Sequence, residues 1–296
     1  MQTVLITGAN GFVGRYLVER LLLLGYCVIA TGRGDDRLHV EHKDLQYQSL
    51  DITDRNAISW ALEKYRPGVV VHTAALSSPD DCESNRILAA ATNTTATRHL
   101  LEAASKQKSF FIFLSTDFVF SGLTGMYSEE DLRQPVNYYG ETKLWAEDLV
   151  REYADRWCII RTVLVYGKRR EGRHNLLTVV AEKLAKGEQY NVFNDQIRTP
   201  TYVEDLTMAI GSIIEKKLRG IFHISGNDVL TPFEMAQMTA RHLGLPESLL
   251  HPVTSDTFEQ PARRPSKTGF TITKAEKEFN FQPTSFAEGL LKTFRE

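Results

Sequence analysis

A tyrosine and a lysine lie four residues apart in the segment Tyr139-Gly140-Glu141-Thr142-Lys143, and Thr116 follows an apolar run upstream. On a helix, residues with this spacing project from one face. A free phenol has a pKa of about 10, and lowering it to about 7 takes roughly 4 kcal/mol. A lysine ammonium about 4 Å away supplies that much at an effective dielectric constant of about 20. The set predicts proton donation from Tyr139 to a carbonyl oxygen that Thr116 holds by a hydrogen bond.

A glycine-rich segment near the start of the chain indicates where a hydride donor would bind. Thr7-Gly8-Ala9-Asn10-Gly11-Phe12-Val13-Gly14 directly follows the apolar run Val4-Leu5-Ile6. Such a turn between a strand and a helix presents backbone amides to the pyrophosphate of a dinucleotide. Gly8 permits the tight turn, Gly11 lets the phosphates approach, and Gly14 lets the helix pack on the strand. We predict cofactor contacts at Gly8, Asn10, Gly11, Phe12, Val13 and Gly14, and nicotinamide-dependent chemistry on a carbonyl or hydroxyl group.

The end of the second predicted strand bears on which nucleotide is bound. An NAD site usually has an acidic residue there, whereas this chain has Thr31-Gly32-Arg33. Arg33 could pair with a 2′-phosphate, which favours NADP(H). NAD(H) stays open, because Asp35 and Asp36 lie close by and could bind a ribose hydroxyl. Asp51, next to Ile52 after the third strand, is placed to accept a hydrogen bond from the adenine amino group. Its alternative role is a helix cap, for which Asp54 is the better candidate.

The elements that must position these residues follow an alternating pattern through the first half of the chain. Short apolar runs predict strands over 4–7, 28–31, 47–50, 69–72, 110–115 and 158–163, and helical periodicity predicts helices over 11–24, 54–65, 86–104 and 139–153. Unbroken apolar strands separated by helices indicate a parallel sheet covered on both faces. The fold class is therefore α/β, a Rossmann-type doubly wound parallel sheet whose ligands bind at the carboxyl ends of the strands.

Beyond Tyr166 the regular alternation of predicted strands and helices ends. A smaller, discontinuous substrate-binding lobe is expected there. Helices are predicted over 175–186 and 203–217, a short strand and turn over 190–200, a strand over 221–224, and three further helices after Ser225. The predicted dinucleotide-binding domain covers 1–165 plus 201–224. The predicted substrate-binding lobe covers 166–200 plus 225–296.

Composition narrows the classes of protein and partner. The 296 residues carry a net charge of −2, which gives no reason to expect a nucleic-acid or anionic-membrane partner. Cys27, Cys82 and Cys158 share no short spacing, so neither a disulfide framework nor a zinc site is expected, and a cytoplasmic location fits. The longest apolar stretch, 21–30, is far shorter than the ~20 residues that span a bilayer. His72, on an apolar strand, is expected to be a packed residue rather than a ligand or base.

Three segments make the chain resemble an extended short-chain dehydrogenase/reductase, and within that group the dTDP-4-dehydrorhamnose reductase family. They are residues 114–122 (LSTDFVFSG), 138–144 (YYGETKL) and 195–201 (DQIRTPT). The resemblance implies Thr116, Tyr139 and Lys143 as the catalytic set, and NADPH or NADH reducing the C4 ketone of a deoxythymidine-diphosphate sugar. With it we assign Ala74, Ala75 and Ser115 to the cofactor, and Thr116, Asp117, Arg198, Arg263 and Arg264 to the nucleotide sugar.

Departures from the family pattern leave other functions open. Leu164 stands where many of these reductases have a Trp that packs on the sugar, and Ser121 stands where Asp is usual. Tyr16 replaces an acidic residue that helps some members bind Mg²⁺ between subunits, so no metal is expected. Segment 222–227 also resembles the β subunit of methionine adenosyltransferase, a regulatory protein. A noncatalytic NADP-binding subunit, a nucleotide-sugar epimerase and a homodimer therefore stay open, whereas Asp117-Phe118 lacks the Glu typical of a dehydratase.

Several cations are candidates for neutralising a nucleotide diphosphate. Lys168, Arg169, Arg170 and Arg173 cluster in a loop that should reach over the substrate. For each of them, and for Arg198, a solvated loop residue is an equally good interpretation. The resemblance favours a role near the nucleotide for Arg263 and Arg264.

Overall fold

The computed structural model describes residues 2–153, 156–170 and 174–295. Its centre is a seven-stranded sheet in the order β10-β6-β5-β4-β1-β2-β3, with every neighbouring pair parallel. The strands are β1 (Thr3–Thr7), β2 (Cys27–Gly32), β3 (Leu45–Ser49), β4 (Val69–His72), β5 (Phe110–Thr116), β6 (Trp157–Thr162) and β10 (Gly220–Ile224). This confirms the predicted doubly wound α/β fold.

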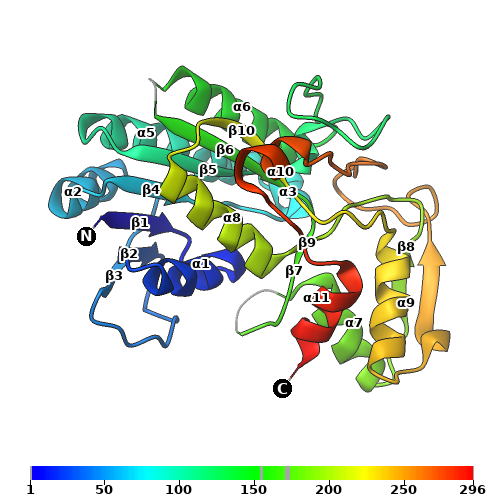
Figure 1. The fold of residues 1–296 in the computed structure, drawn as a ribbon. Coiled ribbons are helices and arrows are strands. Elements are labelled where there is room, and N and C mark those ends of the chain that lie inside the picture. Colours follow the sequence, from blue (N-terminus) through cyan, green and yellow to red (C-terminus); the bar gives the residue numbers. More distant parts are fainter. Residues whose placement is uncertain (1, 154–155, 171–173, 296) are drawn as a thin grey trace.

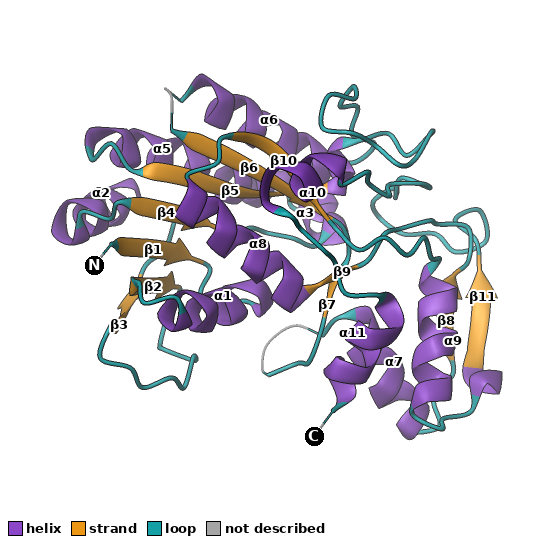
Figure 2. Cartoon of the chain, in the orientation of Figure 1, coloured by secondary structure: helices purple, strands orange, loops and turns teal. Residues whose placement is uncertain are grey.

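Two helical layers cover the sheet (Figures 1 and 2). One layer contains α1 (Phe12–Leu23), α8 (Val203–Lys216) and α10 (Thr273–Phe279), whose apolar side chains share a core with one face of the strands. The other contains α2 (Arg55–Tyr65), α5 (Ala96–Lys106) and α6 (Tyr138–Glu152), which share a second core with the opposite face. Because both faces of the sheet are covered, β1, β4 and β5 are apolar along most of their length, as the sequence indicated, whereas the edge strand β3 has the polar sequence LQYQS and is partly exposed.

The predicted helix over 86–104 differs in one respect. The structure has α4 (Arg86–Ala90), a π-helical turn η1 (Ala91–Thr95) and then α5. A π turn widens the helix locally and often occurs at functional positions. Here it contains the buried Asn93, whose side-chain amide donates to Thr142 Oγ1 at 3.0 Å and to the Leu76 carbonyl at 3.1 Å. The turn thereby connects α6 with the loop after β4.

A smaller lobe lies beyond the carboxyl ends of the strands (Figure 1). It contains α7 (Leu176–Ala185), α9 (Pro232–His242), α11 (Phe286–Phe294) and the parallel pair β8 (Tyr190–Phe193) and β11 (Leu250–Val253). Its apolar side chains form two clusters of their own. A short parallel pair, β7 (Val165–Tyr166) with β9 (Thr201–Tyr202), lies where the chain passes between sheet and lobe.

The segment around α10 packs with the sheet, although the predicted lobe of 166–200 plus 225–296 includes it. Phe270, Ile272, Ala275 and Phe281 belong to the core that contains α1, α8 and the strands. Lys274 donates to the Ile221 carbonyl of β10 at 2.8 Å. The chain therefore returns from the lobe to cover the open edge beside β10, a contact that local periodicity does not reveal.

No helix in the described part of the chain combines the length and apolarity that crossing a bilayer requires.

Candidate active site

The carboxyl end of β5 and the first turns of α6 bring the predicted catalytic residues together. Asn137 caps α6, because its side chain accepts from the Gly140 amide at 2.9 Å. A Cβ on Gly140 would overlap the Phe118 carbonyl oxygen, so this glycine lets α6 approach the chain after β5. Lys143 reaches the strand itself and donates to the Leu114 carbonyl at 2.7 Å. Tyr139 is half-buried one turn earlier, with its ring 5.9 Å from that of Phe118.

Lys143 is almost completely buried. Burial lowers the pKa of its ammonium to about 7, and the Glu147 carboxylate on the same helix opposes that change. A lysine with this environment changes protonation near neutral pH, which is typical of catalytic sites.

Thr116 ends β5, and its hydroxyl already has two partners. It donates to Asp117 Oδ1 at 3.0 Å and accepts from the Phe118 amide at 3.2 Å, starting the short helix η2 (Asp117–Val119). A ligand oxygen that received the Thr116 proton would have to replace Asp117 as acceptor. The hydroxyl of Ser115, a residue that we assigned to the cofactor, donates to Glu147 at 2.6 Å, and the cofactor contact of this residue stays a prediction.

The glycine-rich turn fits the close approach of a dinucleotide. Gly8 has φ +73°, and a Cβ there would lie 2.8 Å from the Ala74 Cα, so the turn and the loop after β4 touch. A Cβ on Gly14 would lie 2.7 Å from the Ala9 Cα, which explains why α1 can pack on its strand only through glycine. The turn and the predicted loop residues Ala74 and Ala75 therefore lie side by side.

The loop after β2 is organised by Asn10, which we predicted to contact the cofactor, and by Tyr47, which the sequence gave little reason to select. Asn10 donates to the Asp35 carbonyl at 3.0 Å and to Tyr47 Oη at 2.8 Å, and it accepts from the Arg37 amide at 3.1 Å. Tyr47 donates to the Gly32 and Gly34 carbonyls. A Cβ on Gly32 would lie 3.1 Å from Asn10 Nδ2 and 3.3 Å from Tyr47 Oη, so an acidic side chain at this position would meet both groups.

The two aspartates after β3 have different partners, and the helix cap predicted for Asp54 is observed. Asp54 caps α2 by accepting from the Asn56 and Ala57 amides. Asp51 accepts from the Thr53 amide and hydroxyl at 2.9 and 2.8 Å, and these bonds, with Arg33 nearby, lower its pKa. Its contact with adenine stays a prediction.

Asp117 and Arg198, both assigned to substrate from the sequence, are buried and bonded within the protein. Asp117 accepts from Thr268 and lies 4.0 Å from Arg198 Nε. Burial raises the pKa of this carboxyl, against the effect of the guanidinium. Arg198 also donates to the carbonyls of Ile197, Pro265 and Ser266 at 2.8–3.2 Å, and to the side chain of Gln196. Through these bonds Arg198 holds residues 196–197 and 265–266 close to Asp117, which directly follows the end of β5.

Arg263 and Arg264 lie on the same returning segment. Arg264 forms a paired contact with the Asp80 carboxylate at 2.5 and 2.6 Å. The Arg263 carbonyl accepts from Asn137, the residue that caps α6, at 2.6 Å. The structure thus places this segment beside the start of α6, while contacts of the two guanidinium groups with a nucleotide stay a prediction.

Residues 168–170 of the basic loop contact α1. Tyr16 donates to the Lys168 carbonyl at 2.7 Å, and Arg170 lies over the Tyr16 ring and pairs with Glu19. Arg173 lies outside the described residues. His72 is a packed residue, as predicted: its ring bonds Thr7 and Thr97, and burial lowers its pKa to about 3.

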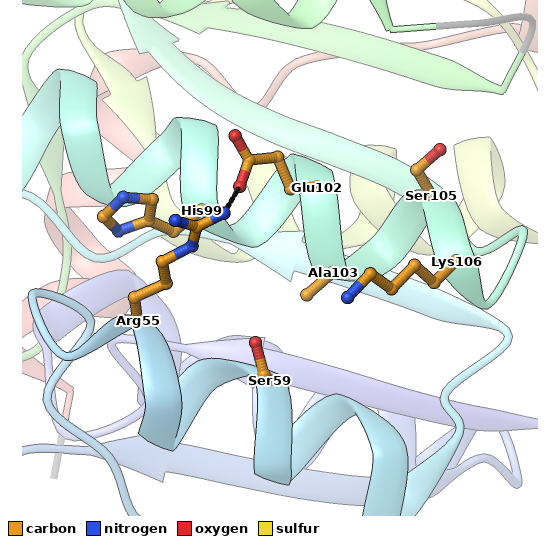
Figure 3. Close-up of a pocket in the computed structure, with 7 residues that line it drawn as sticks. All are labelled: Arg55, Ser59, His99, Glu102, Ala103, Ser105 and Lys106. Carbon is orange, nitrogen blue, oxygen red and sulfur yellow. Dashed lines mark hydrogen bonds and ion pairs between the residues drawn. The ribbon is translucent and has the colours of Figure 1, made fainter.

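A cavity of about 490 Å³ lies elsewhere, between α2 and α5 (Figure 3). Arg55 and Glu102 form an ion pair of 2.9 Å across it, and Ser59, His99, Ala103, Ser105 and Lys106 complete the lining. It contains none of the predicted site residues. Because ligands of doubly wound sheets bind at the carboxyl ends of the strands, this cavity is not the candidate active site.

Sequence reasoning missed Glu147 at the site. Its carboxylate is completely buried and accepts from Ser115, Arg133 and Arg161. The available signal was its position four residues after Lys143, which places both on one helix face.

Comparison with known proteins gives the same family that the sequence motifs suggested. The model of the RmlD substrate binding domain matches residues 1–296. Methionine adenosyltransferase 2 subunit beta of Mus musculus is 31% identical over 293 residues, covering 97% of this chain and 85% of that protein. The probable low-salt glycan biosynthesis reductase Agl14 of Haloferax volcanii is 30% identical over 283 residues, covering 94% of this chain and 93% of that one.

A solved relative extends this agreement to the whole fold. The crystal structure of dTDP-4-dehydrorhamnose reductase from Bacillus anthracis, in complex with NADP, is 29% identical with a TM-score of 0.88, and the match covers 99% of each chain. This chain therefore belongs to the RmlD substrate binding domain family, within the dTDP-4-dehydrorhamnose reductase group of extended short-chain dehydrogenases/reductases.

Proposed function

We propose that this protein is a reductase that prefers NADPH and reduces the C4 ketone of a nucleotide-diphosphate 4-keto-6-deoxy sugar. The observation that carries the proposal is the placement of Thr116, Tyr139 and Lys143 at one strand end, in a sheet whose glycine-rich turn fits a dinucleotide. The NADP-bound reductase from Bacillus anthracis supports both the cofactor and the substrate class.

Each residue has a distinct task in this reaction. NADPH, bound along the glycine-rich turn, supplies the hydride. Thr116 holds the ketone oxygen, and Tyr139 donates a proton to it as negative charge develops there. The Lys143 ammonium stabilises the phenolate that remains on Tyr139 and bonds the nicotinamide ribose. The test is NADPH oxidation with a panel of nucleotide-linked keto sugars. An epimerase would interconvert sugars without net NADPH consumption.

A noncatalytic regulatory subunit is the second candidate, favoured by the 31% identity to methionine adenosyltransferase 2 subunit beta. Its NADP-binding residues would be the same, but the nucleotide sugar would have no site. The two candidates are distinguished by nucleotide binding, which requires no turnover.

A pyrimidine diphosphate such as dTDP is expected to raise the melting temperature further in the presence of saturating NADPH. Binding to the native state alone stabilises by about 2.7 kcal/mol at a hundredfold excess over Kd. Replacing both Arg263 and Arg264 by Ala should diminish the dTDP shift and leave the NADPH shift unchanged. Arg241→Ala, on the exposed face of α9, serves as the control and should keep both shifts. A full NADPH shift with no response to any nucleotide diphosphate would favour the regulatory subunit.

Cofactor preference gives a separate prediction. Arg33→Ala is expected to weaken NADPH binding by roughly 1.5–3 kcal/mol, the scale of a charged hydrogen bond, and to leave NADH binding nearly unchanged. The reason is that only NADPH offers Arg33 a 2′-phosphate. Fluorescence titration with each cofactor measures the difference. Equal losses for both would make Asp35 or Asp36 the better candidate for the ribose contact.

A further inference from the structure

A buried carboxylate lies under the candidate catalytic residues and belongs to none of the roles assigned above. Glu147 is on α6, one helical turn after Lys143, and its side chain is completely buried. Oε1 accepts from Ser115 Oγ at 2.6 Å and from Arg161 Nε at 2.9 Å. Oε2 accepts from Arg161 Nη2 at 2.8 Å and from Arg133 Nη1 at 3.3 Å. These four donors, from three side chains, hold the carboxylate in one position.

Side chains of α6 form hydrogen bonds with Leu114 and Ser115, the two residues of β5 that directly precede Thr116. Lys143 donates to the Leu114 carbonyl at 2.7 Å, and Glu147 accepts from the Ser115 hydroxyl at 2.6 Å. Side chains four residues apart on a helix lie about 5–6 Å from each other at Cβ. The ammonium and the carboxylate therefore share one buried face and fix the same stretch of strand.

Two further titratable groups near Lys143, a histidine and a cysteine, are neutral at pH 7. Burial lowers the pKa of His72, on β4, to about 3, and it raises the pKa of Cys82, on α3 (Pro79–Ser84), to about 11. Tyr139 lies on α6 four residues before Lys143. Among the charges that act on the ammonium, the Glu147 carboxylate is the strongest favourable one.

Arg161 holds the Glu147 carboxylate in place by donating to both of its oxygens. Arg161, on β6, is buried and also donates from Nη1 to the Glu129 carbonyl and to His223 Nε2, each at 3.2 Å. His223 is neutral, because burial and Arg161 lower its pKa well below the usual value. Arg133 is shared between Glu147 and the half-exposed Asp148 at 2.7 Å.

We propose that Glu147 is the positioning residue that keeps Lys143 in its ammonium form and holds Lys143 and Ser115 at the end of β5. The inference deepens the proposed reductase function, since the ammonium is what stabilises the Tyr139 phenolate. Without the Glu147 carboxylate, burial would lower the pKa of the Lys143 ammonium further, so that it would lose its proton at lower pH.

The ionisation of Lys143 is measured directly by NMR titration of protein labelled with ¹³C at the lysine side chains. The Lys143 signal is assigned from its loss in Lys143→Ala. In Glu147→Gln the Lys143 pKa is expected to fall by about one to three pH units, the effect of one nearby opposite charge. Glu147→Asp keeps the charge and should return the titration close to wild type. Asp148→Asn, the matched control, removes the neighbouring carboxylate on the solvent side and should leave the titration unchanged.

Glu147→Gln leaves the Arg161 guanidinium unpaired in the core and can impair folding. The double variant Glu147→Gln with Arg161→Met removes both charges, and Lys143 should still titrate below its wild-type pKa. A wild-type titration in a folded variant that lacks Glu147 would overturn the proposal. In the reductase assay, the alkaline fall of kcat should move to lower pH in Glu147→Gln, with KM little changed. The NMR titration needs no turnover, so a failure to reduce any keto sugar would count against the proposed function alone.

Discussion

Tyr139→Phe is expected to lower kcat for keto-sugar reduction by at least about 10²–10⁴-fold, the range attributed to general acid catalysis. The affinity for NADPH should stay within a few-fold of wild type. The phenol is needed only when a proton moves to the ketone oxygen, so its loss should affect the chemical step and not cofactor binding. Steady-state kinetics with a reducible keto sugar, together with fluorescence titration of NADPH, measure the two effects separately.

Lys143→Ala provides the comparison for this prediction. It should reduce both turnover and NADPH affinity, because in the proposed mechanism the ammonium would stabilise the phenolate and bond the nicotinamide ribose. Its loss also breaks the contact with the Leu114 carbonyl, at 2.7 Å. A Tyr139→Phe variant with near-wild-type kcat would remove Tyr139 from the mechanism. It would then direct attention to Asp117, a buried carboxyl whose pKa is raised by burial.

The parallel sheet was predictable because most of its strands are short, mainly apolar runs separated by helical segments. The strand over 69–72 was predicted with its observed bounds, and β1, β2 and β5 begin or end within one residue of the prediction. The glycine-rich turn was also predictable from the sequence. Glycine is required there because a Cβ at Gly8 or Gly14 would come within 3 Å of neighbouring backbone atoms. These features depend on local sequence.

The partners of the polar side chains were not predictable, because they come from distant parts of the chain. The Ser115 hydroxyl donates to Glu147, which lies 32 residues away on α6, a partner that the sequence did not indicate. Arg264 pairs with Asp80, 184 residues away. The π turn that directs Asn93 toward α6 also has no signal in hydrophobic periodicity, since an extra residue in one turn barely alters the pattern.

Arg198 belongs to such a long-range network of buried polar contacts. Arg198→Met is expected to lower the free energy of unfolding by about 3–5 kcal/mol. The guanidinium is buried and bonds the Ile197, Pro265 and Ser266 carbonyls, with the Asp117 carboxylate 4.0 Å away. Removing it leaves a buried carboxylate and several carbonyls without their donor. Arg198→Lys should rescue little, because one ammonium cannot reproduce the planar fork. Denaturant unfolding measures the loss.

Arg241→Met is the matched control, since Arg241 pairs with Glu247 on the exposed surface at 2.7 Å. It should leave the unfolding midpoint essentially unchanged, because solvent screens such pairs. The comparison also separates the two roles considered for Arg198. A residue that only binds the nucleotide sugar would lose the dTDP response on replacement by Met and keep its unfolding midpoint. A residue that joins the returning segment to the catalytic strand should lose stability even without any ligand, and that is the result the buried contacts of Arg198 predict.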